Sequence, residues 1–368
     1  VLFRSVAAPS GPGGLLGTSL FSAGAKLRLL REPLIGRSKS DSEESVAAFV
    51  RRRLGREVLA YAVDPFVGGI YAGDPERLAV AEAFPFLARA EAEGGSLLRG
   101  AMRLRKTASP EKIKSLAVSF PDGLGELPAA LVRQLDGAVR TGVRVSQMAH
   151  RNGRWELTWQ APSDDEPETR TFHALVLATP AHQLQRLPLP PDVQTVLEPL
   201  DRIAHPPVTS WAFGFRREDV AHALDGFGLL VPSCEQRRLL GVLFPSSLFA
   251  GRAPDGCVLL TAFVGGTRQP ELCAEPPDTL RGIVLEELAA LLGVRGEPLW
   301  DQAFPWPQAI PQYNLGYRAQ IAAADAAEER FPGLFLTGNY RGGIALGNCL
   351  TNGLALADRI VAEAGPRQ

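Results

Sequence analysis

The chain has 368 residues, of which 45% are hydrophobic and 21% are charged, and its formal net charge is −1. This composition predicts a globular protein with two or three domains, and the charge balance excludes a generally basic nucleic-acid-binding protein. No apolar stretch approaches the roughly 18–20 residues that span a membrane, and the first residues lack the charged-then-apolar pattern of a secretory signal.

The first part of the chain, from about residue 20 to residue 100, has helical periodicity. Ser42 is the predicted N-cap of a helix that runs to Arg53, with Ser45 inside its first turn. A further helix is predicted at 81–94.

Charge is distributed unevenly along the chain. Residues 1–115 contain 18 lysine and arginine residues against 12 aspartate and glutamate residues, a net charge of +6. This excess of positive charge favours binding to an anionic membrane surface. Solvated helix faces are the simpler explanation of the same excess.

The rest of the chain alternates between strands and helices. Strand–turn–helix units at 116–139, 174–187 and 334–364 resemble parts of a dinucleotide-binding fold, and a long, mostly antiparallel insertion interrupts them. The predicted fold class is therefore mixed α/β and α+β. Strands are predicted at 116–120, 143–148, 155–160, 169–173, 174–178, 208–215, 226–231, 239–243, 258–265, 300–306 and 334–337, and helices at 127–139, from Pro180, at 279–292 and at 348–364.

The strongest candidate for a binding site is the glycine-rich stretch 338–347. It follows a short apolar strand and precedes a helix, so it places backbone N–H groups at the positive end of the helix. That arrangement suits a cofactor phosphate or a flavin carbonyl, although a glycine-rich connection without a ligand explains the same pattern. A second glycine cluster at 11–17 is not a GxGxxG motif, because Leu16 occupies a glycine position and no buried strand precedes it.

Other chemistry-bearing patterns are scarce. The four cysteines have no CxxC spacing, and the five histidines have no metal-ligand spacing, so we expect reduced thiols, a cytoplasmic location and no metal site. No Walker loop, GxSxG or HExxH motif is present, and no catalytic side chain can be named. Two apolar stretches remain, at 226–232 and 310–317. Each suits a ligand wall, but an alternating apolar strand and an aromatic seam between domains are the common structural explanations.

Taken together, these stretches resemble the protoporphyrinogen and coproporphyrinogen oxidase family within the flavin amine-oxidase-like superfamily. The resemblance rests on six stretches that occur in family order and span nearly all of residues 5–365. They are Asp64–Asp74, Phe120–Leu127, Ala178–His182, Gly226–Pro232, Ile310–Tyr317 and Gly338–Cys349.

The resemblance implies an FAD domain assembled from separate segments, a substrate domain built on an antiparallel sheet, and a helical domain that touches the membrane. It places the helical membrane-associating region at 1–106, together with the start of the substrate domain. It places FAD-binding segments at 116–188 and 317–368, and the substrate domain at 189–316. It also implies a porphyrinogen substrate, O2 as electron acceptor, a peripheral position on the cytoplasmic membrane, and a homodimer as an open alternative.

Individual residues acquire roles from the same resemblance. Val145 is expected at the adenine end of FAD, and Trp306 with the turn 344–346 at the flavin half. The residues expected to hold the cofactor are Val145, Trp306, Gly338, Gly343, Ile344, Ala345 and Leu346. Those expected to line the porphyrinogen cavity are Phe227, Leu230, Leu243 and Phe263. The cofactor carries most of the chemistry in such a site.

The chain departs from the family pattern at its start. It begins at Val1 and contains no strand–GxGxxG unit with an acidic ribose-binding residue, so we expect that segment to be encoded upstream. Gly347 and Asn348 stand where many relatives have Asn and Asp. The resemblance implies oxidation of protoporphyrinogen IX to protoporphyrin IX. The alternatives are oxidation of coproporphyrinogen III, another amine-oxidase-like activity such as carotenoid desaturation, and a folded remnant that binds no FAD.

Overall fold

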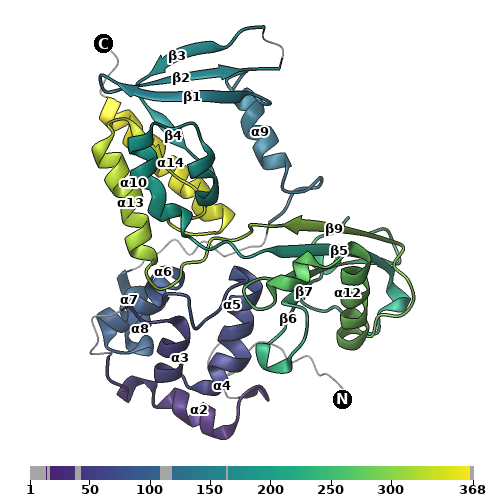
Figure 1. Cartoon of the computed structure of the whole chain (residues 1–368). Helices are drawn as coiled ribbons and strands as arrows, with labels where there is room; N and C mark the ends of the chain where they lie inside the picture. The colour runs from purple at the N-terminus through teal and green to yellow at the C-terminus, as the bar shows by residue number, and fades with distance from the viewer. Residues whose placement is uncertain (1–13, 15–16, 38–42, 108–117, 163–164, 365–368) are drawn as a thin grey trace. The chain divides into compact units, whose positions relative to one another are not determined.

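A computed structural model describes residues 14, 17–37, 43–107, 118–162 and 165–364 (Figure 1). The chain divides into two compact units, each built from two separate segments. Unit 1 comprises Val1–Ile113 and His205–Leu315, and unit 2 comprises Lys114–Ala204 and Gly316–Gln368. The mixture of helices and sheets predicted from the sequence is confirmed.

The N-terminal segment of unit 1 is helical. Its elements are α2 (Ala23–Leu30), η1 (Glu32–Leu34), α3 (Val46–Arg53), α4 (Arg56–Val58), η2 (Leu59–Val63), α5 (Asp64–Tyr71), α6 (Val80–Ala83), α7 (Pro85–Gly94) and α8 (Leu97–Thr107). The continuous helix predicted at 81–94 is broken, because Pro85 starts a new helix after Phe84. No described helix is long and apolar enough to cross a membrane.

The predicted cap of α3 was wrong. Ser45 is the N-cap, with its Oγ accepting a hydrogen bond from the Ala48 N–H at 3.1 Å, whereas Ser42 lies outside the described residues. Ser45 is held in an extended conformation by a bridge to Ala79, so the helix cannot start before Val46.

The second segment of unit 1 forms a five-stranded antiparallel sheet in the order β6-β7-β8-β5-β9. Its strands are β5 (Val208–Arg216), β6 (Gly228–Leu230), β7 (Gly241–Leu243), β8 (Cys257–Gly265) and β9 (Trp300–Trp306), with η4 (Arg217–Asp219), η5 (Ser233–Glu235), α11 (Pro245–Leu248) and η6 (Pro270–Ala274) between them. Helix α12 (Pro277–Leu292) covers one face (Figure 1), and its Leu280, Val284 and Leu288 join the main hydrophobic core. The other face carries the candidate site described below.

Unit 2 contains two small sheets. Strands β1 (Arg144–Arg151), β2 (Arg154–Gln160) and β3 (Glu168–Phe172) pair antiparallel, and β4 (Leu175–Leu177) pairs parallel with β10 (Leu334–Leu336). The helices are α9 (Glu126–Gln134), η3 (Ala181–Arg186), α10 (Pro191–Asp201), α13 (Tyr317–Arg330) and α14 (Leu346–Ala364). The strands predicted at 174–178 and 334–337 are present and pair in parallel, and α14 follows β10 as predicted, whereas the helix predicted from Pro180 is the 3-10 helix η3.

Two predictions for the start of unit 2 differ from the structure. Of the predicted strand at 116–120, residues 116–117 lie outside the described residues, and 118–120 form no strand. Helix α9 ends at Gln134 instead of continuing to 139, because Asp136 and Gly137 adopt positive φ values of 40° and 77°.

Candidate functional site

The face of the five-stranded sheet opposite α12 is lined by apolar side chains in register. Ser210 on β5 lies opposite Phe263 on β8 and Phe304 on β9. Gly241 on β7 lies opposite Phe263 and Leu230. Because residues directly opposite each other point to the same face, Leu230, Phe263 and Phe304 form one row across the sheet.

Leu243 stands two residues after Gly241 on β7, and Trp306 stands two residues after Phe304 on β9, so both side chains lie on the same face as this row. We call Leu230, Leu243, Phe263, Phe304 and Trp306 the open face. Trp306 is 57% exposed, and Leu230, Leu243 and Phe304 are each more than 40% exposed. An apolar patch of this kind on a protein surface marks a binding site more often than a solvated face.

Phe227 differs from the expectation for an alternating strand. In the predicted strand 226–231, the alternation of side chains places Phe227 and Leu229 on the same face. The strand begins instead at Gly228, Leu229 packs against the core, and Phe227 is 63% exposed. Phe227 is therefore not a core residue, which leaves it available to contact a ligand.

Helix α5 borders the open face through two adjacent glycines. A Cβ atom on Gly69 would lie 2.3 Å from Leu230 Cδ2, and one on Gly68 would lie 2.9 Å from Arg268 Nη2. Each glycine inside a helix destabilises it by about 1 kcal/mol relative to alanine. The close approach of Leu230 and Arg268 supplies the physical reason for glycine at both positions.

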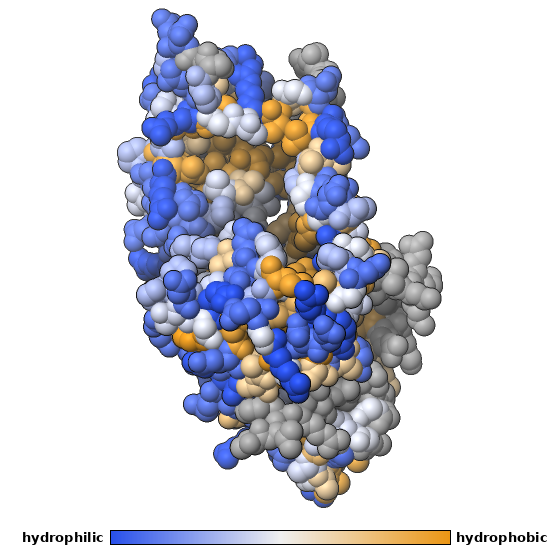
Figure 2. Space-filling model, turned by 90° about the vertical axis from the view of Figure 1, so that its right-hand side faces the viewer, coloured by the Kyte–Doolittle hydropathy of each residue, from blue (hydrophilic) through white to orange (hydrophobic). Residues whose placement is uncertain are grey.

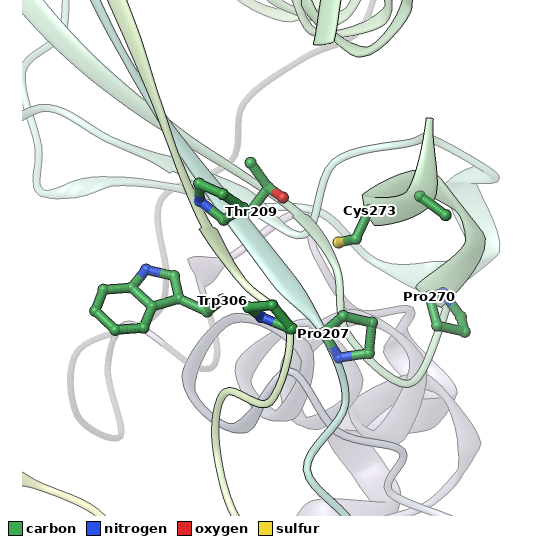
Figure 3. Close-up of a pocket in the computed structure, with 8 residues that line it drawn as sticks. Pro207, Thr209, Pro270, Cys273 and Trp306 are labelled. Carbon is green, nitrogen blue, oxygen red and sulfur yellow. The ribbon is translucent and has the colours of Figure 1, made fainter. Parts of the chain in front are cut away.

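A small cavity is lined by residues of β5, η6 and β9 and by prolines next to these strands (Figure 3). Its volume is about 180 Å³, and the Trp306 indole points away from Cys273 and Pro270 in this view. Tetrapyrrole-sized ligands need pockets of roughly 300–1,000 Å³, so this cavity is too small for such a ligand. It is lined by Pro207, Thr209, Pro270, Cys273, Ala274, Pro305, Trp306 and Pro307.

In unit 2 the glycine-rich turn lies where the parallel strands end. The N–H of Thr337 donates to the Leu177 carbonyl at 3.0 Å, so the chain leaves β10 beside the end of β4. Gly342 and Gly343 have φ values of 80° and 124°, which L-residues rarely adopt. Helix α14, 19 residues long, follows directly, and the first N–H groups of a helix have no partner within it.

Two buried hydroxyl groups at this edge lack partners among the described residues. They are Thr179 Oγ1, after β4, and the phenol of Tyr340, after β10. A Cβ atom on Gly338 would lie 3.6 Å from the Thr179 carbonyl and 2.8 Å from the Tyr340 ring, so the two loops are adjacent. Burial raises the pKa of the Tyr340 phenol, which therefore stays neutral and can donate a hydrogen bond. Orphaned donors beside a glycine turn and a helix N-terminus fit a polar cofactor.

Val145 lies at an irregularity of the other sheet in unit 2. It pairs with Trp159, and the register shifts between Val145 and Gln147. The guanidinium groups of Arg140 and Arg170 each lie 5.9 Å from the centre of the Trp159 ring. Bulges of this kind redirect the backbone and are frequent beside binding sites.

Apolar side chains also reach the surface of unit 2. Figure 2 shows hydrophobic residues gathered in the upper part of the view, the end that carries β1–β3. Val176 in β4 is 41% exposed, and Leu354 and Val361 on α14 are each more than 70% exposed. Strands of parallel sheets are normally covered on both faces, so this surface suits a further contact.

The predicted site residues thus fall into two groups. The predicted substrate residues and Trp306 lie in unit 1, where four of these five form most of the open face. The remaining cofactor residues, Val145, Gly338, Gly343, Ile344, Ala345 and Leu346, lie in unit 2. Sequence reasoning missed Phe304, whose place at alternate positions of β9 was a usable signal. It also missed Thr179 and Tyr340, for which unsatisfied hydrogen bonding is visible only in three dimensions. No cluster of three metal-binding side chains occurs among the described residues.

Comparison with known proteins gives a consistent set of similarities. The model of the family described as flavin containing amine oxidoreductase matches residues 2–361. The mitochondrial protoporphyrinogen oxidase of Nicotiana tabacum is 33% identical, over 96% of this chain and 76% of the relative. The coproporphyrinogen III oxidase of Bacillus subtilis is 25% identical, over 92% and 72%. The crystal structure of a candidate protoporphyrinogen oxidase from Exiguobacterium sp. 255-15 aligns with a TM-score of 0.75 and 22% identity, over 96% of this chain and 75% of that one.

Proposed function

We propose that this chain, which belongs to the family of flavin-containing amine oxidoreductases, converts protoporphyrinogen IX to protoporphyrin IX in haem biosynthesis, with FAD as its cofactor. The single observation that carries the substrate assignment is the open face, an apolar wall formed by residues of β6, β7, β8 and β9. It lies in the part of the chain that is similar to porphyrinogen-oxidising relatives. A broad, flexible tetrapyrrole matches such a wall in shape and polarity.

The cofactor is assigned to residues on both segments of unit 2, and the resemblance also names Trp306 of unit 1. FAD, when bound, accepts the hydride equivalents that leave the porphyrinogen. The turn 343–346 and the N-terminus of α14 present backbone N–H groups, which suit the polar edge of a flavin or its phosphates. Val145 supplies an apolar contact to the remainder, and Thr179 and Tyr340 supply hydroxyl groups that have no partner among the described residues.

The substrate is assigned to Phe227, Leu230, Leu243 and Phe263. Burying each exposed apolar side chain against a ligand contributes about 25 cal/mol per Å² of apolar surface removed from water. The walls exclude water from the reacting carbon, while the carboxylates of the substrate remain in contact with solvent or basic groups. The apolar residues therefore orient the ring, and no side chain of the open face is titratable.

The relatives favour the protoporphyrinogen reaction over the coproporphyrinogen reaction. Two plant protoporphyrinogen oxidases are 31% and 33% identical over 96% of the chain, whereas two bacterial coproporphyrinogen oxidases are 25% and 26% identical. Coproporphyrinogen III carries two more carboxylates, which an apolar wall accommodates poorly. Initial rates with the two substrates, followed by porphyrin fluorescence on the flavin-loaded gene product, test the assignment. A higher kcat/KM with coproporphyrinogen III would reverse it.

The proposed electron acceptor is O2, in keeping with relatives that are named oxidases. Hydrogen peroxide should then form in proportion to porphyrin. Equal rates with and without air would instead point to a different acceptor.

We also propose that the helical segment of unit 1 binds a membrane surface. Helices α2 and α8 both contact η1, and these three elements together expose Leu27, Leu30, Leu34, Leu98 and Met102. Leu34 is 81% exposed, the highest fraction in this group. Exposed basic side chains flank these residues on α2 and α8, so a bilayer surface with anionic lipid matches both features.

Vesicle binding tests this part of the proposal. The chain should sediment with vesicles that contain anionic lipid, and binding should weaken as salt rises, since each basic residue contributes on the order of 1 kcal/mol near such a surface. Leu34→Ser should reduce binding, whereas Leu299→Ser, at an exposed leucine of the sheet segment, should not. Equal binding to neutral and anionic vesicles would refute the electrostatic contribution.

A further inference from the structure

The N-terminal end of α5 is tied to the segment that follows strand β6. Asp64 Oδ2 accepts a hydrogen bond from the Ser233 N–H at 2.7 Å and lies 3.4 Å from Arg268 Nη2. Arg268 Nη1 donates to the Val231 carbonyl at 2.9 Å. Asp64 and Arg268 therefore hold Val231–Ser233 from two sides, and both of their side chains are largely buried.

The C-terminal end of α5 is fixed as well. Gln312 Nε2 donates to the Tyr71 carbonyl at 2.7 Å, and the Thr267 N–H donates to the Ala72 carbonyl at 2.7 Å. These bonds satisfy carbonyl groups that a helix C-terminus otherwise leaves open. Helix α5 is thus a rigid support, attached at both ends to loops of the sheet segment.

Strand β6 depends on this support. It is an edge strand of three residues, paired only with β7, and such a short strand has few ladder hydrogen bonds of its own. Leu230, its last residue, directly precedes the segment that Asp64 and Arg268 hold. Leu230 also rests on Gly69 of α5, where a Cβ atom would collide with it.

We propose that Asp64 and Arg268 are positioning residues for porphyrinogen binding: they clamp the end of β6 to α5 and thereby set the place of Leu230 on the open face. The clamp rests on the proposed function, because it acts on the face assigned there to the substrate. Neither residue touches the substrate, and each acts through the backbone of Val231–Ser233. The buried charge of Arg268 is matched by Asp64, so the clamp adds no free charge beside the apolar face.

Asp64→Asn in the flavin-loaded gene product tests the clamp. The amide oxygen still accepts from Ser233, but the charge that holds Arg268 is lost. The KM for protoporphyrinogen should rise about tenfold while kcat changes little, because an interaction that positions a binding wall acts on ground state and transition state alike. Arg268→Lys should restore much of the affinity that Arg268→Met loses.

A matched control separates positioning from general stability. Arg281→Gln removes the ion pairs of Arg281 with Asp301 and Glu297 on the α12 side of the same sheet. It should lower the melting temperature while leaving KM unchanged. If Asp64→Asn also lowers the melting temperature without a change in KM, the clamp is structural only and the proposal fails.

Hydrogen exchange on the wild type provides a second measurement that does not depend on the folding of any variant. Protoporphyrin IX, added to the 368-residue chain, should slow exchange at β6 and at the Ser233 amide together, because the clamp couples them. Protection of the open face without protection of Ser233 would overturn the proposal. A wild-type enzyme that oxidises no porphyrinogen would refute the proposed function instead, which distinguishes the two failures.

Discussion

Gly69→Ala offers a sharp test of the open face, because its two effects on the protein are separable. In α5 the added Cβ would lie 2.3 Å from Leu230 Cδ2, whereas an ordinary contact between carbon atoms is about 3.5–4.0 Å. Leu230 must therefore move by more than about 1 Å. It is 45% exposed, so its flexible end has room to turn toward the surface that we assign to the substrate.

The substitution has two opposing effects on the free energy of unfolding. Replacing a helix-interior glycine with alanine stabilises the helix by about 1 kcal/mol, which offsets the strain of moving Leu230. The free energy of unfolding should then change by less than about 1 kcal/mol. Binding of the porphyrinogen should weaken by about 1–3 kcal/mol, a rise of roughly ten- to a hundredfold in KM, because one wall of the site has shifted.

Gly282→Ala on α12 is the matched control. A Cβ atom at Gly282 meets nothing within 4 Å, so that substitution reports helix propensity alone. Thermal unfolding and steady-state kinetics on the same preparations give both quantities for each variant. An unchanged KM in Gly69→Ala, with the melting temperature of wild type, would remove Leu230 from the substrate wall.

Three further outcomes are expected. Phe227→Ala should raise KM about tenfold with little change in melting temperature, because Phe227 is 63% exposed; a large loss of stability would show that the ring packs against the protein. FAD should bind the 368-residue chain weakly and be lost during purification, since the chain contains no GxGxxG unit for the pyrophosphate; stoichiometric flavin in the purified chain would contradict this reasoning. Burial favours the neutral form of Glu91, but hydrogen bonds and charge from Arg52 and Arg53 hold its pKa below the ordinary 4.5. The stability that the Glu91 carboxylate contributes is therefore fully present above pH 4.5 and is lost as pH falls through the lower pKa of the folded state. Glu91→Gln should lower the melting temperature at neutral pH and lower it less in acid. An equal effect at all pH values would argue against the ion pairs.

Regular elements with strong local signals were predictable. Strand β9 has the predicted bounds, Trp300–Trp306, and three of its seven residues are aromatic, a residue type that favours strands. Helix α14 begins at Leu346, two residues before its predicted start, and its end at Ala364 matches. The open face could also be anticipated in part, because the resemblance named Leu230, Leu243, Phe263 and Trp306.

Elements that depend on tertiary contacts were not predictable. Ser42 and Ser45 are equally good caps by sequence, and only the bridge to Ala79 selects Ser45. Helix α13 was missed because its buried face consists largely of small alanines, which give little hydrophobic periodicity. Phe227 follows the alternating pattern but lies just outside the strand: its carbonyl accepts a hydrogen bond from the Phe244 N–H at 2.9 Å, and the ladder with β7 starts at Gly228.

The division of unit 2 into two chain segments has a consequence for the order of folding. Strand β4 pairs with β10 although the whole sheet segment of unit 1 lies between them in the chain, so their encounter closes a very long loop. The Ala309 N–H donates to the Pro206 carbonyl at 3.2 Å, so the folded sheet segment brings its own two ends together. Once that segment has formed, the loop still to be closed is much shorter than the full stretch of chain between the two strands, so pairing β4 with β10 costs less entropy. We expect the antiparallel sheet to form first, and Phe213→Ala in its core to delay the protection of both strands in pulsed hydrogen exchange. Early protection of β4 and β10 in that variant would show that unit 2 assembles without prior folding of the antiparallel sheet.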